Sequence, residues 1–218
     1  MTVIAIDGPA GAGKSTVARR VAEELQIPYL DTGAMYRCVA LQALRDGVDP
    51  NSELQVAEIA QQVSITLNGA HVGLNGDDVS ELIRTAEVAS IVSLIAVHSP
   101  VRDAMRTQQR QWIAQQGGGV VEGRDIGTVV FPDADVKIFL TASPHERARR
   151  RVEQQGGDID KVAAGIAERD RIDSTREDSP LRPADDAVIV DSTGKTIDQV
   201  VSEIVNAYSS QERANNHG

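Results

Sequence analysis

Gly8-Pro-Ala-Gly-Ala-Gly-Lys-Ser15 is the stretch that decides the fold of this chain, and it directly follows the apolar run Val3-Ile4-Ala5-Ile6. That run predicts a buried strand, and the spacing of apolar residues over Ser15–Leu25 predicts a helix. Between them lies the pattern G-x-x-x-x-G-K-[ST], the phosphate-binding P-loop. Glycines let the backbone bend around a phosphate with its N–H groups directed inward, and the helix adds its positive N-terminal end. The stretch therefore predicts a site for a nucleoside triphosphate.

The parts of the loop have separate expected roles. Lys14 is expected to reach the β- and γ-phosphates of ATP, and the Ser15 hydroxyl to ligate a Mg²⁺ ion. The residues expected to bind ATP are Gly8, Pro9, Ala10, Gly11, Ala12, Gly13, Lys14, Ser15 and Thr16. The alternative is a glycine-rich turn that binds nothing, which the complete motif in its strand–loop–helix context disfavours.

The composition is that of an ordinary globular protein, with 41% hydrophobic and 25% charged residues among 218. No apolar run approaches the roughly 20 residues of a membrane span, and no signal-peptide core is visible near the N-terminus. We therefore expect a cytoplasmic location. The net charge of −10 argues against a nucleic-acid or anionic-membrane partner. The single Cys38 excludes an internal disulfide, and the four histidines lack metal-ligand spacing. A monomer is expected as well.

The positive residues are mostly arginines, which make up 18 of the 22 Lys and Arg residues. A planar guanidinium suits bidentate contact with phosphate, although a genomic preference for Arg would also produce such a bias. Two groups stand out, and their members are Arg102, Arg106 and Arg110 in one segment and Arg169, Arg171 and Arg176 in another. Arg106 and Arg110 also fit a solvated helix face. Focused arginines in an acidic chain favour a small phosphorylated ligand.

Strand and helix patterns alternate along the chain, which predicts an α/β fold with a parallel sheet between two layers of helices. Strands are expected at 3–6, 28–30, 120–122, 136–140 and 187–190, and helices at 15–25, 33–46, 52–62, 85–97, 99–114, 144–153, 160–175 and 196–208. Capping-box patterns begin at Ser52, Ser143 and Thr196. Short β-like runs with two Asn-Gly turns over Val63–Val79 predict a small antiparallel insert.

The P-loop alone does not decide the reaction, because switches, motors and kinases share it. The chain lacks the guanine-selecting Asn-Lys-x-Asp of a regulatory GTPase, and Val120-Val121-Glu122 poorly matches the acidic strand end of a motor ATPase. Arginines spread over several segments, together with small inserts, favour a kinase that closes a lid over two phosphorylated substrates.

Four ordered motifs, together with the β insert, resemble the bacterial cytidylate kinases. They are Gly8–Thr16, Asp31–Arg37, Glu122–Pro132 and Glu168–Arg176. The resemblance implies Mg²⁺-assisted transfer of the ATP γ-phosphoryl group to CMP or dCMP. It also implies a single P-loop kinase domain over 1–218 with a core, an insert that binds the nucleoside monophosphate and a short helical lid. The expected core is 1–38, 84–147 and 177–209, the insert about 39–83 with its β part at about 63–79, the lid about 148–176, and 210–218 a disordered tail.

The resemblance also implies roles for individual residues. Those expected to contact CMP are Thr32, Arg37, Ser93, Arg102, Arg124, Asp125, Arg169 and Asp173, and those expected to be catalytic are Lys14, Arg124, Arg169 and Arg176. Arg102 and Asp125, with Ser93, would read the cytosine edge. Asp31 would either cap the helix that follows it or contact the ligand.

Two alternatives remain open at this point. A kinase with another acceptor, such as UMP, AMP or a shikimate-like hydroxyl compound, would share the P-loop and the lid. A hydroxyl acceptor would use a positioned carboxylate, for which Asp31 and Asp125 are candidates. A binding protein that takes up ATP without transferring phosphate is the second alternative, which the dispersed arginines disfavour.

Overall fold

The computed structural model describes residues 1–216, which form two compact units. One unit comprises residues 1–29 and the described residues from 113 onward, and the other comprises residues 30–112. Helix α5 (Ser99–Gln116) runs across the division. The division into core, insert and lid that the sequence suggests stays a prediction.

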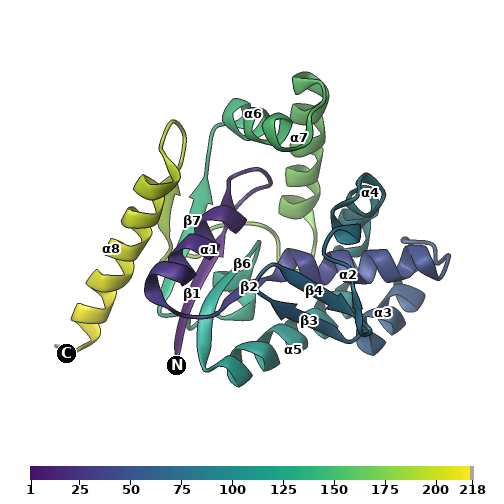
Figure 1. Ribbon diagram of the computed structural model, residues 1–218, viewed down its shortest axis with the longest axis horizontal. Coiled ribbons are helices and arrows are strands. Elements are labelled where there is room, and N and C mark those ends of the chain that lie inside the picture. The colour runs from purple at the N-terminus through teal and green to yellow at the C-terminus, as the bar shows by residue number, and fades with distance from the viewer. Residues whose placement is uncertain (217–218) are drawn as a thin grey trace. The chain divides into compact units, whose positions relative to one another are not determined.

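A five-stranded sheet has the order β2-β6-β1-β7-β8, and every strand of it except β2 lies wholly in the first unit (Figure 1). Its strands are β1 (Thr2–Asp7), β2 (Tyr29–Asp31), β6 (Gly118–Gly123), β7 (Val136–Thr141) and β8 (Val188–Asp191). β1 pairs in parallel with β6 and β7, and β7 pairs in parallel with β8. In the register of the central pairs, Asp7 lies opposite Gly123 and Phe139. The predicted α/β architecture with a parallel sheet is confirmed.

The core of this unit lies between the sheet and helices α1 (Lys14–Leu25) and α8 (Ile197–Asn216), which pack against each other (Figure 1). Ile6, Val21 and Ile204 are each fully buried there. A buried aliphatic side chain of this kind stabilises the fold by about 1.5–3 kcal/mol. The apolar face of the last helix thus anchors it beside the P-loop helix.

Two further helices of the first unit are α6 (Pro144–Gln155) and α7 (Ile159–Thr175), which pack as a pair. The predicted lid, about 148–176, falls mostly on these two helices, and its role as a lid stays a prediction. A one-turn π-helix, η2 (Ile126–Val130), follows β6 directly after Asp125. It lies between the strands predicted at 120–122 and 136–140, where the sequence predicts no helix.

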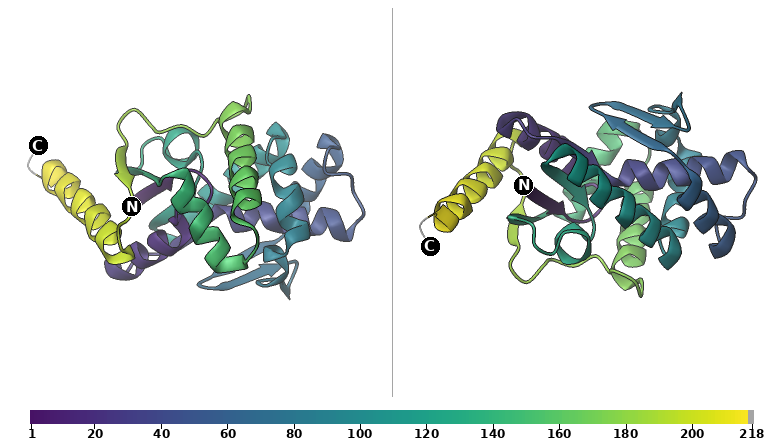
Figure 2. Two further views of the ribbon diagram at one scale, coloured as in Figure 1. Left: turned by 90° about the horizontal axis from the view of Figure 1, so that it is seen from above. Right: turned by 90° about the horizontal axis from the view of Figure 1, so that it is seen from below.

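The second unit contains helices and a small sheet of its own. Its elements are α2 (Thr32–Arg45), α3 (Glu53–Gln62), β3 (Ile65–Asn68), β4 (His71–Leu74), β5 (Asp77–Asp78), the 3₁₀-helix η1 (Leu82–Arg84) and α4 (Ala86–Ile95). The three strands are antiparallel in the order β3-β4-β5 and lie beside one another in Figure 2. The predicted β insert is therefore confirmed, with its two Asn-Gly turns joining the strands.

Side-chain caps explain where several helices begin. Ser143 accepts from the Glu146 N–H at 3.3 Å, and Thr196 and Gln199 bond each other's backbone N–H groups reciprocally, as predicted. The capping prediction at Ser52 is wrong, because its side chain makes no cap hydrogen bond. The turn before it is held instead by Asp49, whose carboxylate accepts from the Asn51 N–H at 2.9 Å.

The disordered tail predicted over 210–218 is wrong as far as Asn216, because α8 continues to that residue. Residues 209–216 are polar but contain no Gly or Pro, so nothing in them stops a helix that is already nucleated upstream. Residues 217–218 lie outside the described part of the chain. Ile197, the first residue of this helix, is 47% exposed.

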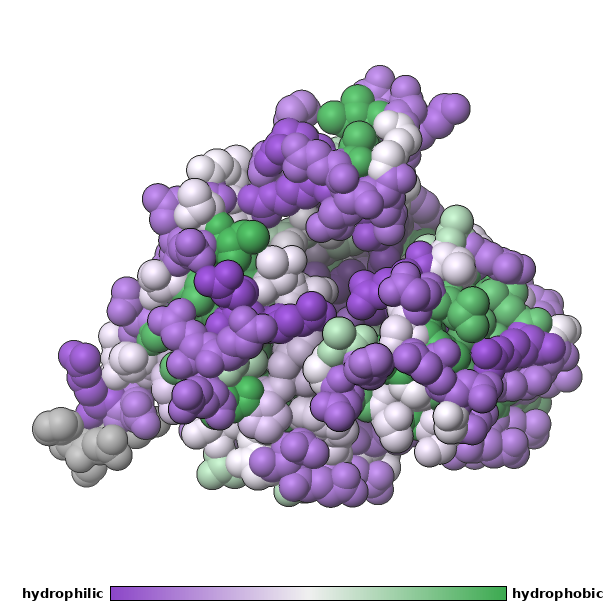
Figure 3. All heavy atoms as spheres, in the orientation of Figure 1, coloured by the Kyte–Doolittle hydropathy of each residue, from purple (hydrophilic) through white to green (hydrophobic). Residues whose placement is uncertain are grey.

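The surface is mostly hydrophilic on the face drawn in Figure 3. Over residues 1–216, no single helix is both long and apolar enough to cross a membrane. Only α4 and α5 taken together meet that length and composition, as a pair bent by 104°.

Candidate nucleotide site

The P-loop connects β1 to α1 and takes the backbone shape that its glycines permit. Gly8, Gly11 and Gly13 have φ angles of 152°, 76° and 90°, a region that side chains disfavour. A Cβ atom at Gly8 would lie 2.0 Å from the carbonyl oxygen of Leu140. The first glycine is therefore required by the close approach of β7, and the later two by the turn itself.

Lys14 begins α1 and is only 7% exposed. Its Nζ donates to the carbonyl oxygen of Pro9 at 2.9 Å, which folds the side chain back over the loop. Burial, followed by the positive charges of Arg124 and Arg169, lowers the pKa of Lys14 to about 7 against the opposing effect of Glu122. A buried amine among cations gains a large interaction energy when a phosphate arrives.

A network of arginines and carboxylates lies on the same unit. Arg124 Nε is 2.9 Å from Asp173 Oδ2, and Arg176 contacts Asp125 at 3.5 Å and Asp173 at 3.8 Å. Burial alone would raise the pKa of Asp173, but Arg124, Arg169 and Arg176 outweigh it and hold that pKa below its ordinary value. Four residues predicted to contact the acceptor or to be catalytic, Arg124, Asp125, Asp173 and Arg176, thus interact with one another.

Asp7 is a buried residue of this region that sequence reasoning missed. It ends β1, is 5% exposed, and its two carboxylate oxygens accept from the N–H groups of Ile126 and Gly127 at 2.8 and 2.7 Å. Burial raises the pKa of Asp7 to about 6, although these hydrogen bonds oppose the rise. The one feature of the sequence that could have indicated a role for Asp7 is its position directly before the P-loop. Its carboxylate ties the start of the loop to the turn after Asp125.

Contacts from α6 and α7 to the P-loop were also absent from the predicted site. Arg147 Nη1 donates to the Ala10 carbonyl oxygen at 3.0 Å and pairs with Asp170, whose carboxylate accepts from the Ala10 N–H at 3.1 Å. Arg150 Nη1 donates to the Ala12 carbonyl oxygen at 3.3 Å. The run of arginines over 147–151 was the only sequence signal, and it did not distinguish these contacts from surface charge.

The second unit holds the other predicted acceptor residues. Thr32 is buried at the start of α2, and Arg37 pairs with Asp31 at 2.8 Å. The other oxygen of Asp31 accepts from the Ala34 N–H at 2.9 Å, so Asp31 does cap the helix. Arg102 is 1% exposed, and its Nη1 donates to the Ala96 carbonyl oxygen at 3.3 Å.

Arg102 also lies 5.9 Å from the centre of the Tyr36 ring, within the range of a cation–π contact. Ser93 is half-buried on α4. The predicted acceptor residues therefore divide evenly between the units, with Thr32, Arg37, Ser93 and Arg102 in one and Arg124, Asp125, Arg169 and Asp173 in the other.

The residues at the loop fit a Mg²⁺ ion that is bound together with a nucleotide. Ser15 follows Lys14 on α1 and is exposed, so its hydroxyl is an accessible hard oxygen donor. Within residues 1–216, no group of three or more His, Cys, Asp or Glu side chains could hold a metal by itself. That donor set suits a cation that takes most of its ligands from phosphates and water.

Comparison with known proteins places this site in a family. The family model for cytidylate kinase matches residues 4–210. The chain belongs to the cytidylate kinase family. A cytidylate kinase of Geobacillus kaustophilus is 50% identical to it over 93% of this chain and 94% of that protein.

Other relatives of this family member differ in length or in sequence. A bifunctional pantoate ligase/cytidylate kinase of Prochlorococcus marinus is 48% identical over 96% of this chain, which spans only 43% of that relative. A gluconokinase structure from Sinorhizobium meliloti superposes with a TM-score of 0.55 at 14% identity, covering 100% of this chain and 97% of the other. At that identity the match reflects a shared fold alone.

Proposed function

We propose that this chain transfers the γ-phosphoryl group of ATP to CMP and dCMP, giving ADP and CDP or dCDP. The observation that carries the proposal is the buried Lys14 in the P-loop, close enough to Arg124 and Arg169 for their charges to lower its pKa. Cations gathered at a triphosphate-binding loop are what phosphoryl transfer requires. Membership of the cytidylate kinase family supports the choice of acceptor.

The acceptor in this reaction is itself a phosphate oxygen. Its second pKa is about 6, so at neutral pH it is mostly ionised and needs no general base. The work left to the chain is to align the two phosphates and to neutralise the charge that spreads over the transferring group. We assign this role to Lys14, Arg124, Arg169 and Arg176.

The ion pairs described above give these arginines a resting arrangement. Arg124 is held by Asp173, and Arg176 lies near both Asp125 and Asp173. An incoming phosphate would compete with these carboxylates for the guanidinium groups. Because the carboxylates hold the arginines in place, less side-chain entropy is lost when the phosphate binds.

Recognition of the acceptor is assigned residue by residue. Arg102 would donate to the cytosine carbonyl and ring nitrogen, Asp125 would accept from the exocyclic amine, and Ser93 would also contact the base. Thr32 and Arg37 would contact the nucleotide, Arg37 on its phosphate. Asp173 would accept from the sugar hydroxyls. These roles are proposals that the substitutions below test.

Mg²⁺ is proposed to enter with ATP and to be held by the Ser15 hydroxyl. When bound, it would neutralise charge on the phosphates. A monomer in the cytoplasm that engages neither nucleic acid nor membrane remains our prediction for the state of the protein.

A panel of acceptors tests the proposed function. In a coupled assay with ATP, we expect CMP and dCMP to be phosphorylated with much higher kcat/KM than UMP, AMP or dTMP. Equal or better activity with UMP or AMP would refute the assignment to cytosine acceptors. ATP binding without transfer to any acceptor in the panel would instead favour a nucleotide-dependent binding protein.

Replacement of Arg102 tests how the base is read. Arg102→Met should reduce kcat/KM for CMP by about tenfold to a hundredfold, as expected for a lost charged hydrogen bond, while KM for ATP changes little. Because Arg102 is fully buried, Arg102→Lys serves as a second variant that keeps the charge. Arg110→Met, at an exposed position on the same helix, is the matched control. A rise in KM for ATP as large as that for CMP would contradict the role.

A further inference from the structure

Arg147 and Arg150 lie one helical turn apart on α6, and each donates to a carbonyl oxygen of the P-loop. α6 packs closely against the loop here, because a Cβ atom at Gly11 would lie 3.1 Å from the Cβ of Arg147. The contacts join residues more than 130 positions apart in sequence. The conformation of the P-loop therefore depends on tertiary contacts with α6.

The direction of each loop peptide follows from these bonds. In a planar trans peptide, the C=O of one residue and the N–H of the next point in opposite directions. The Pro9 carbonyl accepts from Lys14 Nζ, so it faces the lysine, and the Ala10 N–H in the same peptide faces away, toward Asp170. The Lys14 side of the loop is thus its inner side, and the Asp170 side is its outer side.

The next peptide is held by the ion pair of Arg147 and Asp170. The Ala10 carbonyl accepts from Arg147 on the outer side, which turns the N–H of Gly11 inward, to the side of Lys14. Both polar groups of Ala10 are therefore bound by one pair of side chains. A second oriented peptide lies two residues further on.

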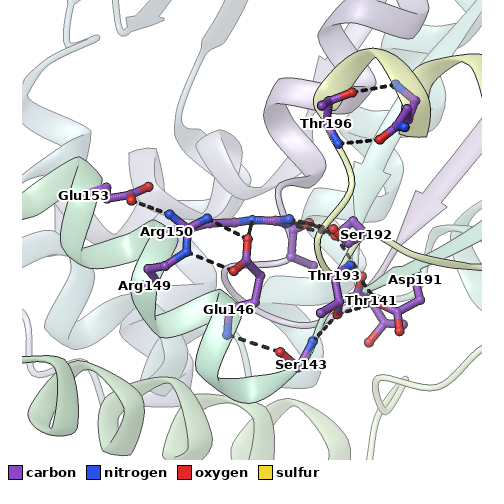
Figure 4. A network of polar contacts seen from close by, with 12 residues as sticks. Thr141, Ser143, Glu146, Arg149, Arg150, Glu153, Asp191, Ser192, Thr193 and Thr196 are labelled. Atoms are coloured by element: carbon purple, nitrogen blue, oxygen red, sulfur yellow. Dashed lines mark hydrogen bonds and ion pairs between the residues drawn. The ribbon is translucent and has the colours of Figure 1, made fainter.

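Arg150 orients that second peptide. Its guanidinium donates to the Ala12 carbonyl at 3.3 Å, so the following N–H of Gly13 points the opposite way. The Ser192 hydroxyl lies 3.4 Å from the same carbonyl and 3.0 Å from the Thr141 carbonyl, and its single hydrogen is shared between these two acceptors. Figure 4 shows Arg150 lying between Glu146 and Ser192. Its Nε donates to Glu146 at 2.9 Å, and its Nη atoms donate to the hydroxyl and carbonyl of Ser192 at 2.9 and 2.7 Å.

We propose that Arg147 and Arg150 are positioning residues for the donor phosphates, which hold the Ala10 and Ala12 carbonyls outward and so direct the Gly11 and Gly13 N–H groups at the triphosphate. They act from behind the loop, through the backbone. Without them, either peptide could rotate and present a carbonyl oxygen, which repels an anion. This inference deepens the proposed function because it concerns how the same loop holds ATP.

The test measures binding of two probes, a non-hydrolysable ATP analogue and inorganic tripolyphosphate, by calorimetry. For Arg150→Met we expect the Kd of both probes to rise about tenfold, the effect of one lost hydrogen bond in a desolvated site. Arg150→Lys should recover part of the loss, since an ammonium group can still donate to one carbonyl. Ser192→Ala should also raise the Kd of both probes, but by a smaller factor than Arg150→Met.

The control is Arg149→Met on the same helix. Arg149 is exposed and pairs with Glu146 and Glu153 (Figure 4), so we expect both Kd values to stay within twofold of wild type. Glu146 keeps Arg149 as a partner when Arg150 is replaced, so the Arg150 variant is expected to fold. Arg147→Met is combined with Asp170→Asn to avoid an unpaired, partly buried carboxylate, and the double variant should also bind both probes more weakly.

Three results would overturn the inference. One is an unchanged Kd of both probes in Arg150→Met. Another is a rise in Kd in Arg149→Met as large as the rise in Arg150→Met. The third is weaker binding of the ATP analogue with unchanged binding of tripolyphosphate, because Arg150 would then affect contacts with the nucleoside rather than with the phosphates. Steady-state assays should show KM for ATP rising while KM for CMP stays within twofold. A wild-type protein that binds both probes but phosphorylates no acceptor would refute the proposed function and leave this inference standing.

Discussion

The buried carboxylate of Asp7 has a measurable consequence at the scale of single residues. Its pKa is about 6 in the folded chain, against 3.8 for an unperturbed Asp. Between these values the native state binds more protons than the unfolded state, so the free energy of unfolding falls as the pH rises through this window. A shift of about two units corresponds to about 3 kcal/mol.

Asp7→Asn should remove this pH dependence. Urea unfolding at pH 4, 5, 6 and 7 measures this. As the pH rises, the free energy of unfolding of the wild type should fall by up to about 3 kcal/mol relative to that of the variant. The absolute stability of the variant is a separate matter, because an amide can accept only through its oxygen and leaves the Ile126 or Gly127 N–H poorly bonded. A stability difference between the two proteins that stays constant over this range would contradict the prediction.

Lys14 is the residue on which turnover should depend most. Lys14→Ala removes the buried amine that faces the loop, and we expect kcat for CMP phosphorylation to fall by a factor on the order of 10³, typical for a lost electrostatic group at a transition state. Lys161→Ala, at an exposed position on α7, is the control and should retain wild-type activity. Retention of more than a tenth of the activity in Lys14→Ala would show that the lysine is not essential.

At the scale of elements, α8 shows how a helix far along the chain supports the P-loop helix. Ile204 is fully buried between α8, α1 and the sheet, whereas Ile197 on the same helix is 47% exposed. Ile204→Ala should lower the free energy of unfolding by about 2–4 kcal/mol, and Ile197→Ala by less than about 1 kcal/mol. Urea denaturation of both variants measures the contrast. Equal losses would mean that α8 is not anchored by its inner face.

Element boundaries also separate what local sequence encodes from what it does not. The reciprocal cap of Thr196 and Gln199 and the Ser143 cap lie within a few residues, and both were predictable. The extension of α8 through 210–216 was missed because a polar segment carries no periodic signal, although it contains no helix breaker either. The π-helix η2 was missed for a different reason, since Asp7, distant in sequence, binds its first N–H groups.

At the scale of the whole molecule, ligands that bind only the folded chain should raise its melting temperature. A ligand at 100 times its Kd adds about 2.7 kcal/mol, and for a chain of this size 1 kcal/mol corresponds to roughly 2–4 °C. We therefore expect an ATP analogue and CMP each to raise the Tm by about 5–10 °C at saturation. Thermal denaturation with each ligand separately measures this.

Lys14→Ala supplies the control for that measurement. Its Tm should no longer respond to the ATP analogue at the same concentration but should still rise with CMP. Loss of both responses would indicate that the substitution disturbs the fold of the chain rather than the donor site.

The sequence by itself determined the fold class, the P-loop, the β insert and the family, because these depend on motifs and periodicities that are local along the chain. Lys14, Ser15 and the arginine motifs could be named for the same reason. Only the tertiary structure decided that Asp7 binds η2, that Arg124 pairs with Asp173, and that Arg147 and Arg150 hold loop carbonyls. Each of these contacts joins segments separated by 49 to 138 residues. No local pattern encodes them, since they exist only once the strands have set the loop and the helices side by side.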